Sequence, residues 1–117
     1  MNNKKLSALI ELSSNVKIYV PSTADVDQAT DNSAIVDRTL SQLAKMFGGS
    51  TQYDALGCWQ SATVGLVKEH VVICQSYCSE QQLQDNIDTV IDICTTIKQE
   101  MKQEAIALEI NNKLYFV

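Results

Sequence analysis

One helix constrains the fold of this chain more than any other feature. Ser79 and Gln82 have the spacing of a capping box, in which each side chain accepts a hydrogen bond from the other residue's backbone amide. Apolar side chains then recur at alternating intervals of four and three residues: Leu83, Ile87, Val90, Cys94, Ile97 and Met101. This single stripe predicts a long amphipathic helix packed on a core. A coiled-coil seam has a similar pattern, but too few heptads are present to favour it.

A second long helix is predicted earlier in the chain. Asp31 and Ser33 can both cap its start. Apolar residues then repeat at helical spacing, at Val36, Leu40, Leu43 and Phe47. Gly48 follows in the position where a glycine commonly ends a helix.

The segment 66–77 predicts a central strand of the sheet. Val67, Val71 and Ile73 alternate with Val72 and Cys74, so apolar side chains fall on both of its faces. Alternation predicts further strands over residues 16–20, 56–61 and 106–110, and a return strand over 113–117. Pro21 ends the first strand, and Asn111-Asn112 suits a two-residue hairpin turn between the last two.

These elements together predict an α+β fold, a ferredoxin-like βαββαβ sandwich with an extra C-terminal β-hairpin strand. Leu6, Leu9, Ile10 and Leu12 predict a short N-terminal helix within residues 1–15, and residues 16–117 form the single domain. Two helices can cover one face of the sheet only. We therefore expect a homo-oligomer, most simply a homodimer, that covers the other face.

Composition narrows the environment and the partners. Nine basic residues against fourteen acidic ones give a net charge of −5, which disfavours nucleic-acid binding. We expect a cytoplasmic protein because no export signal or membrane-spanning stretch is present. The four cysteines are therefore expected to be reduced thiols that act as small hydrophobic residues.

Gly49, Ser50 and Thr51 follow the first long helix in a glycine-rich turn. Amide and hydroxyl groups of this kind can form a nest that holds an anion. Phosphate-binding loops precede a helix, however, whereas this turn follows one. Helix termination is therefore the simpler interpretation, and ligand contact is the alternative.

Trp59 and Glu69 are the other candidate ligand-binding residues. A lone Trp in a small domain usually fills the core or an interface, so we expect Trp59 to be mostly buried, with a pocket wall as the alternative. Glu69 stands in an otherwise apolar strand, where its carboxylate needs a sheet edge or a partner such as Lys17. We expect no catalytic residues, cofactor or metal, because His70, Cys74 and Cys78 lie roughly 13 Å apart along a strand.

Several short motifs resemble a group of small uncharacterised proteins of bacteria, phages and mobile elements. The matching motifs run from residue 17 to 21, from 47 to 51 and from 57 to 59, and continue with Gly65, Glu69 and residues 103–107. The resemblance implies a shared fold and a shared pocket formed by Thr51, Trp59 and Glu69. It implies no particular reaction.

Three functions are compatible with these observations. The main hypothesis is a non-catalytic binding module of a phage or mobile element, which binds a small ligand or a host protein and could serve counter-defence. The second is a small enzyme with a pocket at a dimer interface that uses Glu69 or His70. The third is a structural or assembly protein. Fold alone does not choose among them.

Overall fold

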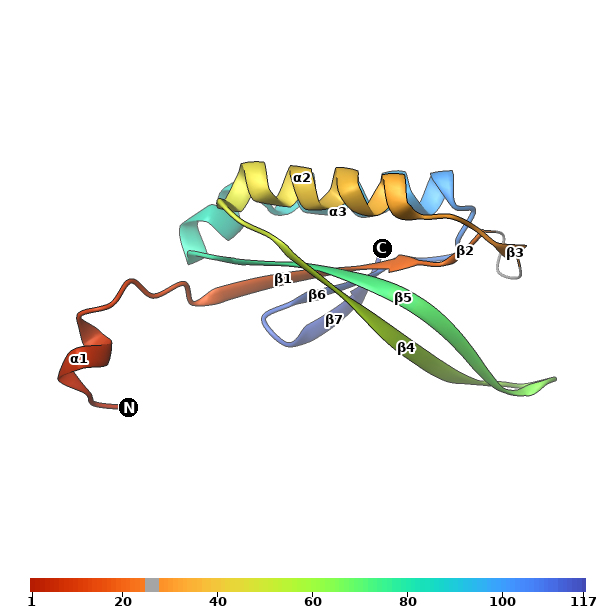
Figure 1. The fold of residues 1–117 in the computed structure, drawn as a ribbon, viewed down its shortest axis with the longest axis horizontal. Helices are drawn as coiled ribbons and strands as arrows, with labels where there is room; N and C mark the ends of the chain where they lie inside the picture. The colour runs from red at the N-terminus through yellow and green to blue at the C-terminus, as the bar shows by residue number, and fades with distance from the viewer. Residues whose placement is uncertain (25–27) are drawn as a thin grey trace.

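The computed structural model describes residues 1–24 and 28–117 as an α+β protein, in which a five-stranded antiparallel sheet carries two long helices on one face (Figure 1). The sheet order is β4-β5-β1-β6-β7. Its strands are β1 (Ser14–Pro21), β4 (Thr51–Ser61), β5 (Gly65–Cys78), β6 (Ala107–Ile110) and β7 (Lys113–Phe116). The polar stretch 22–30, which the sequence suggests is a loop, contributes the small pair β2 (Thr23–Ala24) and β3 (Gln28–Ala29).

Strand β1 lies in the middle of the sheet and forms the floor of the core. It pairs with β5 on one side and β6 on the other, so its backbone is hydrogen-bonded along both edges. Val16, Ile18 and Val20 point toward the helices and are fully buried. The alternation in the sequence predicted this strand, and the structure confirms it.

The two long helices cover this face of the sheet. Helix α2 spans Ser33–Phe47 and helix α3 spans Glu80–Glu100. The capping box at Ser79 and Gln82 is present in full. Gly48 ends α2 in the left-handed region at φ 96°, a conformation that glycine adopts without a steric penalty. Both helix predictions are therefore confirmed.

The opposite face, which we call the open face, carries no helix (Figure 1). Successive residues of a strand point to opposite faces, so Val71 lies on the open face while its neighbour Val72 packs against the core. Ile73 also points to the open face but is only 6% exposed. Its register partners Tyr19 and Tyr53 stand on either side of it and shield it.

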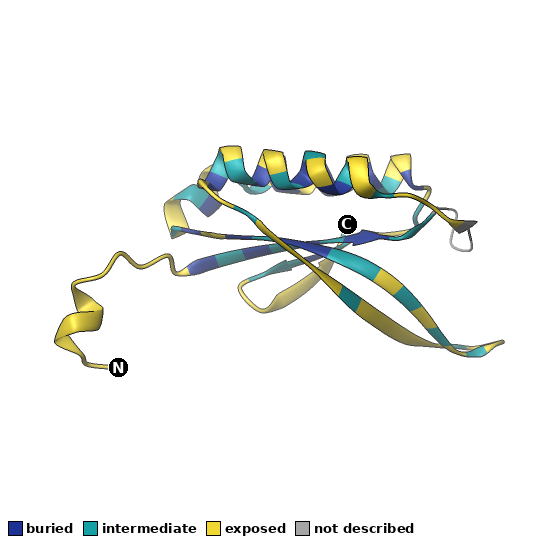
Figure 2. Ribbon diagram, in the orientation of Figure 1, coloured by how far each residue is buried: buried dark blue, intermediate teal, exposed yellow. Residues whose placement is uncertain are grey.

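The β4–β5 hairpin extends well past the ends of the helices, and most of its outer part is exposed (Figure 2). The structure begins β4 at Thr51, five residues before the strand predicted from position 56. The residues 51–55 are mostly polar and exposed, so they lack the alternation that identifies a half-buried strand. The Asn111-Asn112 turn has positive φ at both residues, 50° and 68°, as predicted.

The N-terminal helix is shorter than predicted. Helix α1 spans only Lys4–Ser7, and none of its residues is buried. So short a helix is marginal in water without a packing partner. It stands off from the sheet (Figure 1) and does not cover the open face. None of the helices in the described parts of the chain is long and apolar enough to cross a membrane.

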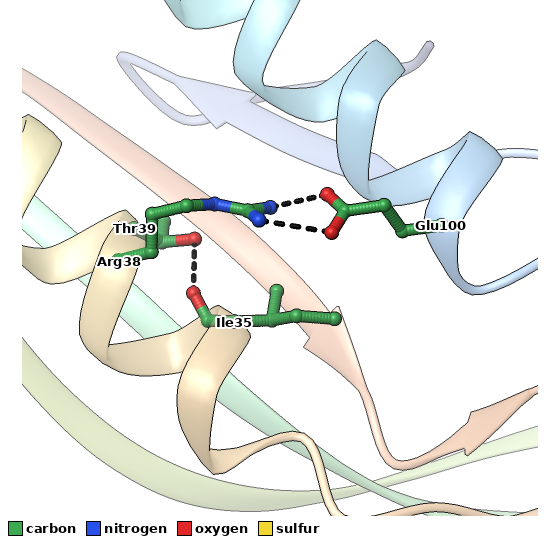
Figure 3. A network of polar contacts seen from close by, with 4 residues as sticks. All are labelled: Ile35, Arg38, Thr39 and Glu100. Carbon is green, nitrogen blue, oxygen red and sulfur yellow. Dashed lines mark hydrogen bonds and ion pairs between the residues drawn. The ribbon is translucent and has the colours of Figure 1, made fainter.

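A bidentate ion pair links α2 to α3 (Figure 3). The guanidinium of Arg38 donates to both carboxylate oxygens of Glu100, and this hydrogen bonding lowers the pKa of Glu100. Both side chains are about two-fifths exposed, at 40% and 38%, so the pair contributes little to stability. On the neighbouring turn, the hydroxyl of buried Thr39 donates to the carbonyl oxygen of Ile35 at 2.7 Å.

Truncating the buried stripe of α3 should be costly. Ile97 is fully buried against the sheet, so Ile97→Ala should lower the free energy of unfolding by about 2–5 kcal/mol, which is the usual cost of the cavity and the lost apolar contacts. Val64 at the hairpin tip is 74% exposed, and Val64→Ala should cost less than about 0.5 kcal/mol. Chemical denaturation measures both values. Equal effects of the two variants would show that α3 does not pack as described.

Candidate functional site

The main candidate site is a hollow of about 580 Å³ at the open face. It forms where the β4–β5 hairpin leaves the body of the sheet, beside the connection between α3 and β6. Its lining comes from five separate parts of the chain: Tyr19 and Pro21, Gly57 to Trp59, Glu69 and Val71, Gln103 to Ala107, and Leu114 with Phe116. Strands of the sheet therefore form most of the lining of the hollow, and the connection between α3 and β6 completes it.

Glu69 lies in this hollow within a chain of hydrogen bonds. The Thr23 hydroxyl donates to its Oε1 at 2.8 Å, and Nε2 of Gln103 donates to the Thr23 carbonyl oxygen at 2.8 Å. The carboxylate is partnered, as one of the two expected alternatives, but by Thr23 and not by the suggested Lys17, which lies 3.4 Å from Glu109 instead. The hydrogen bonds between described residues use Oε1 of Glu69 and not its Oε2.

Gly57 leaves space directly beside that carboxylate. It is the register partner of Glu69 on the adjacent strand, so the two residues share a face. A Cβ atom at position 57 would meet only the backbone oxygen of Glu69, at 3.7 Å, which is an ordinary contact. The absence of a side chain at position 57 therefore enlarges the hollow. The backbone itself would accept a larger residue at this position.

Trp59 forms a wall of the hollow and is 51% exposed. The expectation that it is mostly buried is wrong. It lies two residues after Gly57 on β4, so its side chain is on the open face, which carries no helix to cover it (Figure 1). A half-exposed Trp offers a flat apolar surface to a planar ring or to a cation.

The charge in this hollow is negative. Glu69 and Glu104 are the charged side chains among its lining residues, none of which is Lys or Arg. An adjoining hollow of about 380 Å³ shares Trp59 and Glu69 and adds Lys68 and His70. The larger hollow thus offers two carboxylates and aromatic surface to a cationic ligand.

Gly49, Ser50 and Thr51 lie elsewhere. They line a separate hollow of about 380 Å³ at the other end of β4. Eight residues of strand separate Thr51 from Trp59, roughly 26 Å. The turn therefore does not approach Trp59 and Glu69, and the structure does not form the single pocket that the sequence suggested. Ser50 donates to the Leu40 carbonyl oxygen at 2.8 Å, and Ser76 donates to that of Gly49 at 2.6 Å, so the turn is tied into the fold.

Several lining residues were not identified from the sequence as site residues. Gln103 and Glu104 belong to a motif that was noted only for its family resemblance. Tyr19 reads as a strand residue, yet its hydroxyl donates to Oε1 of Glu109 at 3.0 Å. Partial burial and this hydrogen bond raise the pKa of Tyr19. Tyr19 is far from Gln103 and Glu104 in the sequence, and these residues come together only because distant strands pair in the sheet.

The cysteines do not gather into a site. All four are free thiols, and no group of three or more His, Cys, Asp or Glu within residues 1–24 and 28–117 could hold a metal ion. Burial raises the pKa of Cys74 to about 11 and that of Cys94 to about 12, and it also raises that of Cys78. Cys58 alone is exposed, and it lines the open-face hollow.

Comparisons with known proteins found likenesses of structure. No protein-family model matches the sequence, and no curated protein sequence matches it. A phage SAM lyase in complex with S-methyl-5′-thioadenosine is similar at a TM-score of 0.64 and 16% identity, over 93% of this chain and 92% of that one. A phage SAM lyase in the apo state is similar at 0.65 and 18%, over 93% and 94%. The shared fold extends over nearly the whole of each chain.

This finding corrects the main functional hypothesis drawn from the sequence. A non-catalytic binding module is contradicted, as is the expectation that the chain is not an enzyme, because the similar structures are those of a lyase. The likeness favours the alternative of a small enzyme. It also agrees with the expected phage relationship, since both similar structures are phage proteins.

Thiol labelling should separate Cys58 from the other cysteines. In the native protein at pH 8, a thiol reagent should modify Cys58 within minutes, because its side chain is exposed. Cys74, Cys78 and Cys94 should react only after denaturant is added, because they are buried and their raised pKa values keep them protonated. Mass spectrometry counts the labels. More than one label on the native chain would contradict the packing of the core.

Proposed function

We propose that this protein binds S-adenosylmethionine in the open-face hollow and cleaves it, with release of S-methyl-5′-thioadenosine. The observation that carries the proposal is the match of fold to a phage SAM lyase over 93% of this chain and 92–94% of the similar ones. One of those structures contains S-methyl-5′-thioadenosine. This thioether remains when the bond between sulfur and the four-carbon amino-acid part of S-adenosylmethionine breaks and the bonding electrons stay on sulfur. The carboxylate of the substrate can attack the carbon of this bond as the bond breaks, so that the four-carbon part leaves as a lactone and no co-reactant is needed.

The hollow suits this substrate in size, charge and surface. Its volume of about 580 Å³ lies within the usual range for small-molecule sites. S-adenosylmethionine carries a sulfonium and an ammonium group against one carboxylate, and Glu69 and Glu104 offer charge of the opposite sign. Trp59 supplies a flat surface on which the adenine ring can stack.

Physical reasoning favours a specific role for Glu69. The positive charge on the sulfonium disappears as the carbon–sulfur bond breaks, so a carboxylate beside the sulfur would stabilise the substrate more than the transition state. The ammonium group keeps its charge throughout the reaction. We therefore assign Oε2 of Glu69 to the ammonium group, with Thr23 and Gln103 fixing the orientation of the carboxylate.

We also infer that the sheet has the split-βαβ, ferredoxin-like arrangement. The order β4-β5-β1-β6, with a helix after β1 and another after β5, supports this inference, and β7 is then the added strand. A homo-oligomer remains our expectation. A second copy lying on the open face would exclude water from the hollow, which is the pocket at a dimer interface considered from the sequence.

The test is the formation of S-methyl-5′-thioadenosine from S-adenosylmethionine, followed by liquid chromatography and mass spectrometry. Glu69→Gln should lower the rate by about tenfold or more, because a charge-assisted hydrogen bond is lost while the shape is kept. Thr51→Val is the matched control. It lies in the other hollow and should change the rate by less than about twofold.

The outcomes separate the possible sites. Activity that survives Glu69→Gln but is lost in Thr51→Val would place the reaction at the glycine-rich turn, where Gly49, Ser50 and Thr51 remain predicted ligand contacts. An active protein unaffected by either change would remove both assignments. The proposal fails if the wild-type protein neither forms nor binds S-methyl-5′-thioadenosine.

Filling the hollow gives a second test. Gly57→Val should keep the fold, because the added Cβ meets no close atom, but it should weaken S-methyl-5′-thioadenosine binding by about tenfold or more. The same ligand should slow the labelling of Cys58 in the wild-type protein. Isothermal titration and labelling rates measure these effects. Unchanged binding in Gly57→Val would place the ligand outside this hollow.

A further inference from the structure

A second hollow has a different character from the open-face site. We call it the α3–hairpin groove. It lies between α3 and the β6–β7 hairpin and has a volume of about 580 Å³. Its lining is apolar except for Gln84: Leu83, Gln84, Ile87, Ile91, Leu108, Ile110, Tyr115, Phe116 and Val117. Several of these side chains are strongly exposed, including Tyr115 at 48% and Phe116 at 73%.

The same chain carries an unpartnered apolar segment, the N-terminal arm of residues 1–12. Leu6, Leu9 and Ile10 are 50%, 66% and 95% exposed. Helix α1, which contains Leu6, has no buried residue. The arm leads away from the sheet, and α1 stands clear of the rest of the fold (Figure 1). So many exposed large apolar side chains on twelve residues indicate a surface that is covered in the functional protein.

The charges of the N-terminal arm and of the α3–hairpin groove are of opposite sign. The arm carries Lys4 and Lys5 beside its apolar residues. The half of α3 that borders the groove carries Glu80, Asp85 and Asp88, with no basic residue before Lys98, and Glu80 and Asp88 each lie one helical turn from Gln84 in the groove. Asp92 lines a different hollow, with Arg38 of α2. The other rim of the groove carries Lys113, and the arm has a single carboxylate, Glu11.

We propose that the N-terminal arm of one copy of this chain docks in the α3–hairpin groove of a second copy. Leu9 and Ile10 enter the groove, and Lys4 and Lys5 lie along the acidic side of α3. Because each copy offers both an arm and a groove, the exchange can close as a symmetric assembly. This interface shares Phe116 with the lining of the open-face hollow, but its other lining residues are different and it does not depend on the proposed activity.

Photo-crosslinking between differently labelled copies tests the contact directly. A photoreactive amino acid replaces Ile10, and the protein is prepared with ¹⁴N and with ¹⁵N, unfolded, mixed and refolded together. We expect crosslinks to residues 83–91 or 113–117, and mixed ¹⁴N–¹⁵N pairs among them. Crosslinks confined to one isotope would mean that the arm folds back on its own chain. Crosslinks elsewhere, or none, would also overturn the proposal.

Association in solution gives an independent test by analytical ultracentrifugation. Ile91→Asp should weaken self-association by about tenfold or more, because it places a charge in the groove, and Ile91 is exposed enough for the monomer to fold. Thr96→Asp is the matched control, since it adds the same charge to an exposed position of α3 outside the groove and should change nothing. Equal behaviour of the two variants would overturn the proposal.

A charge exchange completes the design. Lys4→Glu with Lys5→Glu should weaken association, and adding Glu80→Lys with Asp88→Lys should restore it in the same chain, because both acidic residues lie one helical turn from Gln84 in the groove. Circular dichroism confirms that each variant folds. Failure of the second pair to restore association would show that the arm and α3 do not meet.

Discussion

The main constraint on this fold is that two helices cover only part of one face of a long sheet. Val16, Ile18 and Val20 of β1 are fully buried because α2 and α3 lie over them. The apolar stripe of α3 packs on this part of the sheet only. Beyond it, the β4–β5 hairpin continues with no second layer, and the open face has none at all. The same limit that gives the protein a small dry core therefore leaves a large area of sheet with apolar and aromatic side chains facing outward.

The candidate site is a product of that uncovered area. Trp59 is available to a ligand because the open face carries no helix, and Glu69 is available because its register partner is a glycine. Thr23 and Gln103 then come in from two connecting segments and hold the carboxylate in place. A site built in this way needs no cavity in the core, so binding and stability depend on largely separate residues.

Much of the fold could be predicted from the sequence, because it is encoded locally. The capping box at Ser79, the stripe from Leu83 to Met101 and the turn at Asn111 each depend on neighbouring residues, and all three are present. The site could be predicted only in part. Trp59 and Glu69 were recognised as candidates, but whether they meet Thr51 or Gln103 depends on where distant strands and connections end. The exposure of Trp59 could not be predicted for the same reason, since nothing in the local sequence shows that this face of β4 has no second layer over it.

The connecting segments that complete the lining of the hollow affect how freely its residues can be substituted. Gln103 and Glu104 lie in the connection between α3 and β6 and are not members of the buried apolar core, so substitutions at these positions change the lining of the hollow while the apolar packing stays the same. The core itself needs only apolar side chains of suitable volume. Two chains can therefore share this backbone while most of their residues differ, as the 16–18% identity between this chain and the two similar structures shows. The lining of the hollow is free to vary without any change in the architecture that holds it.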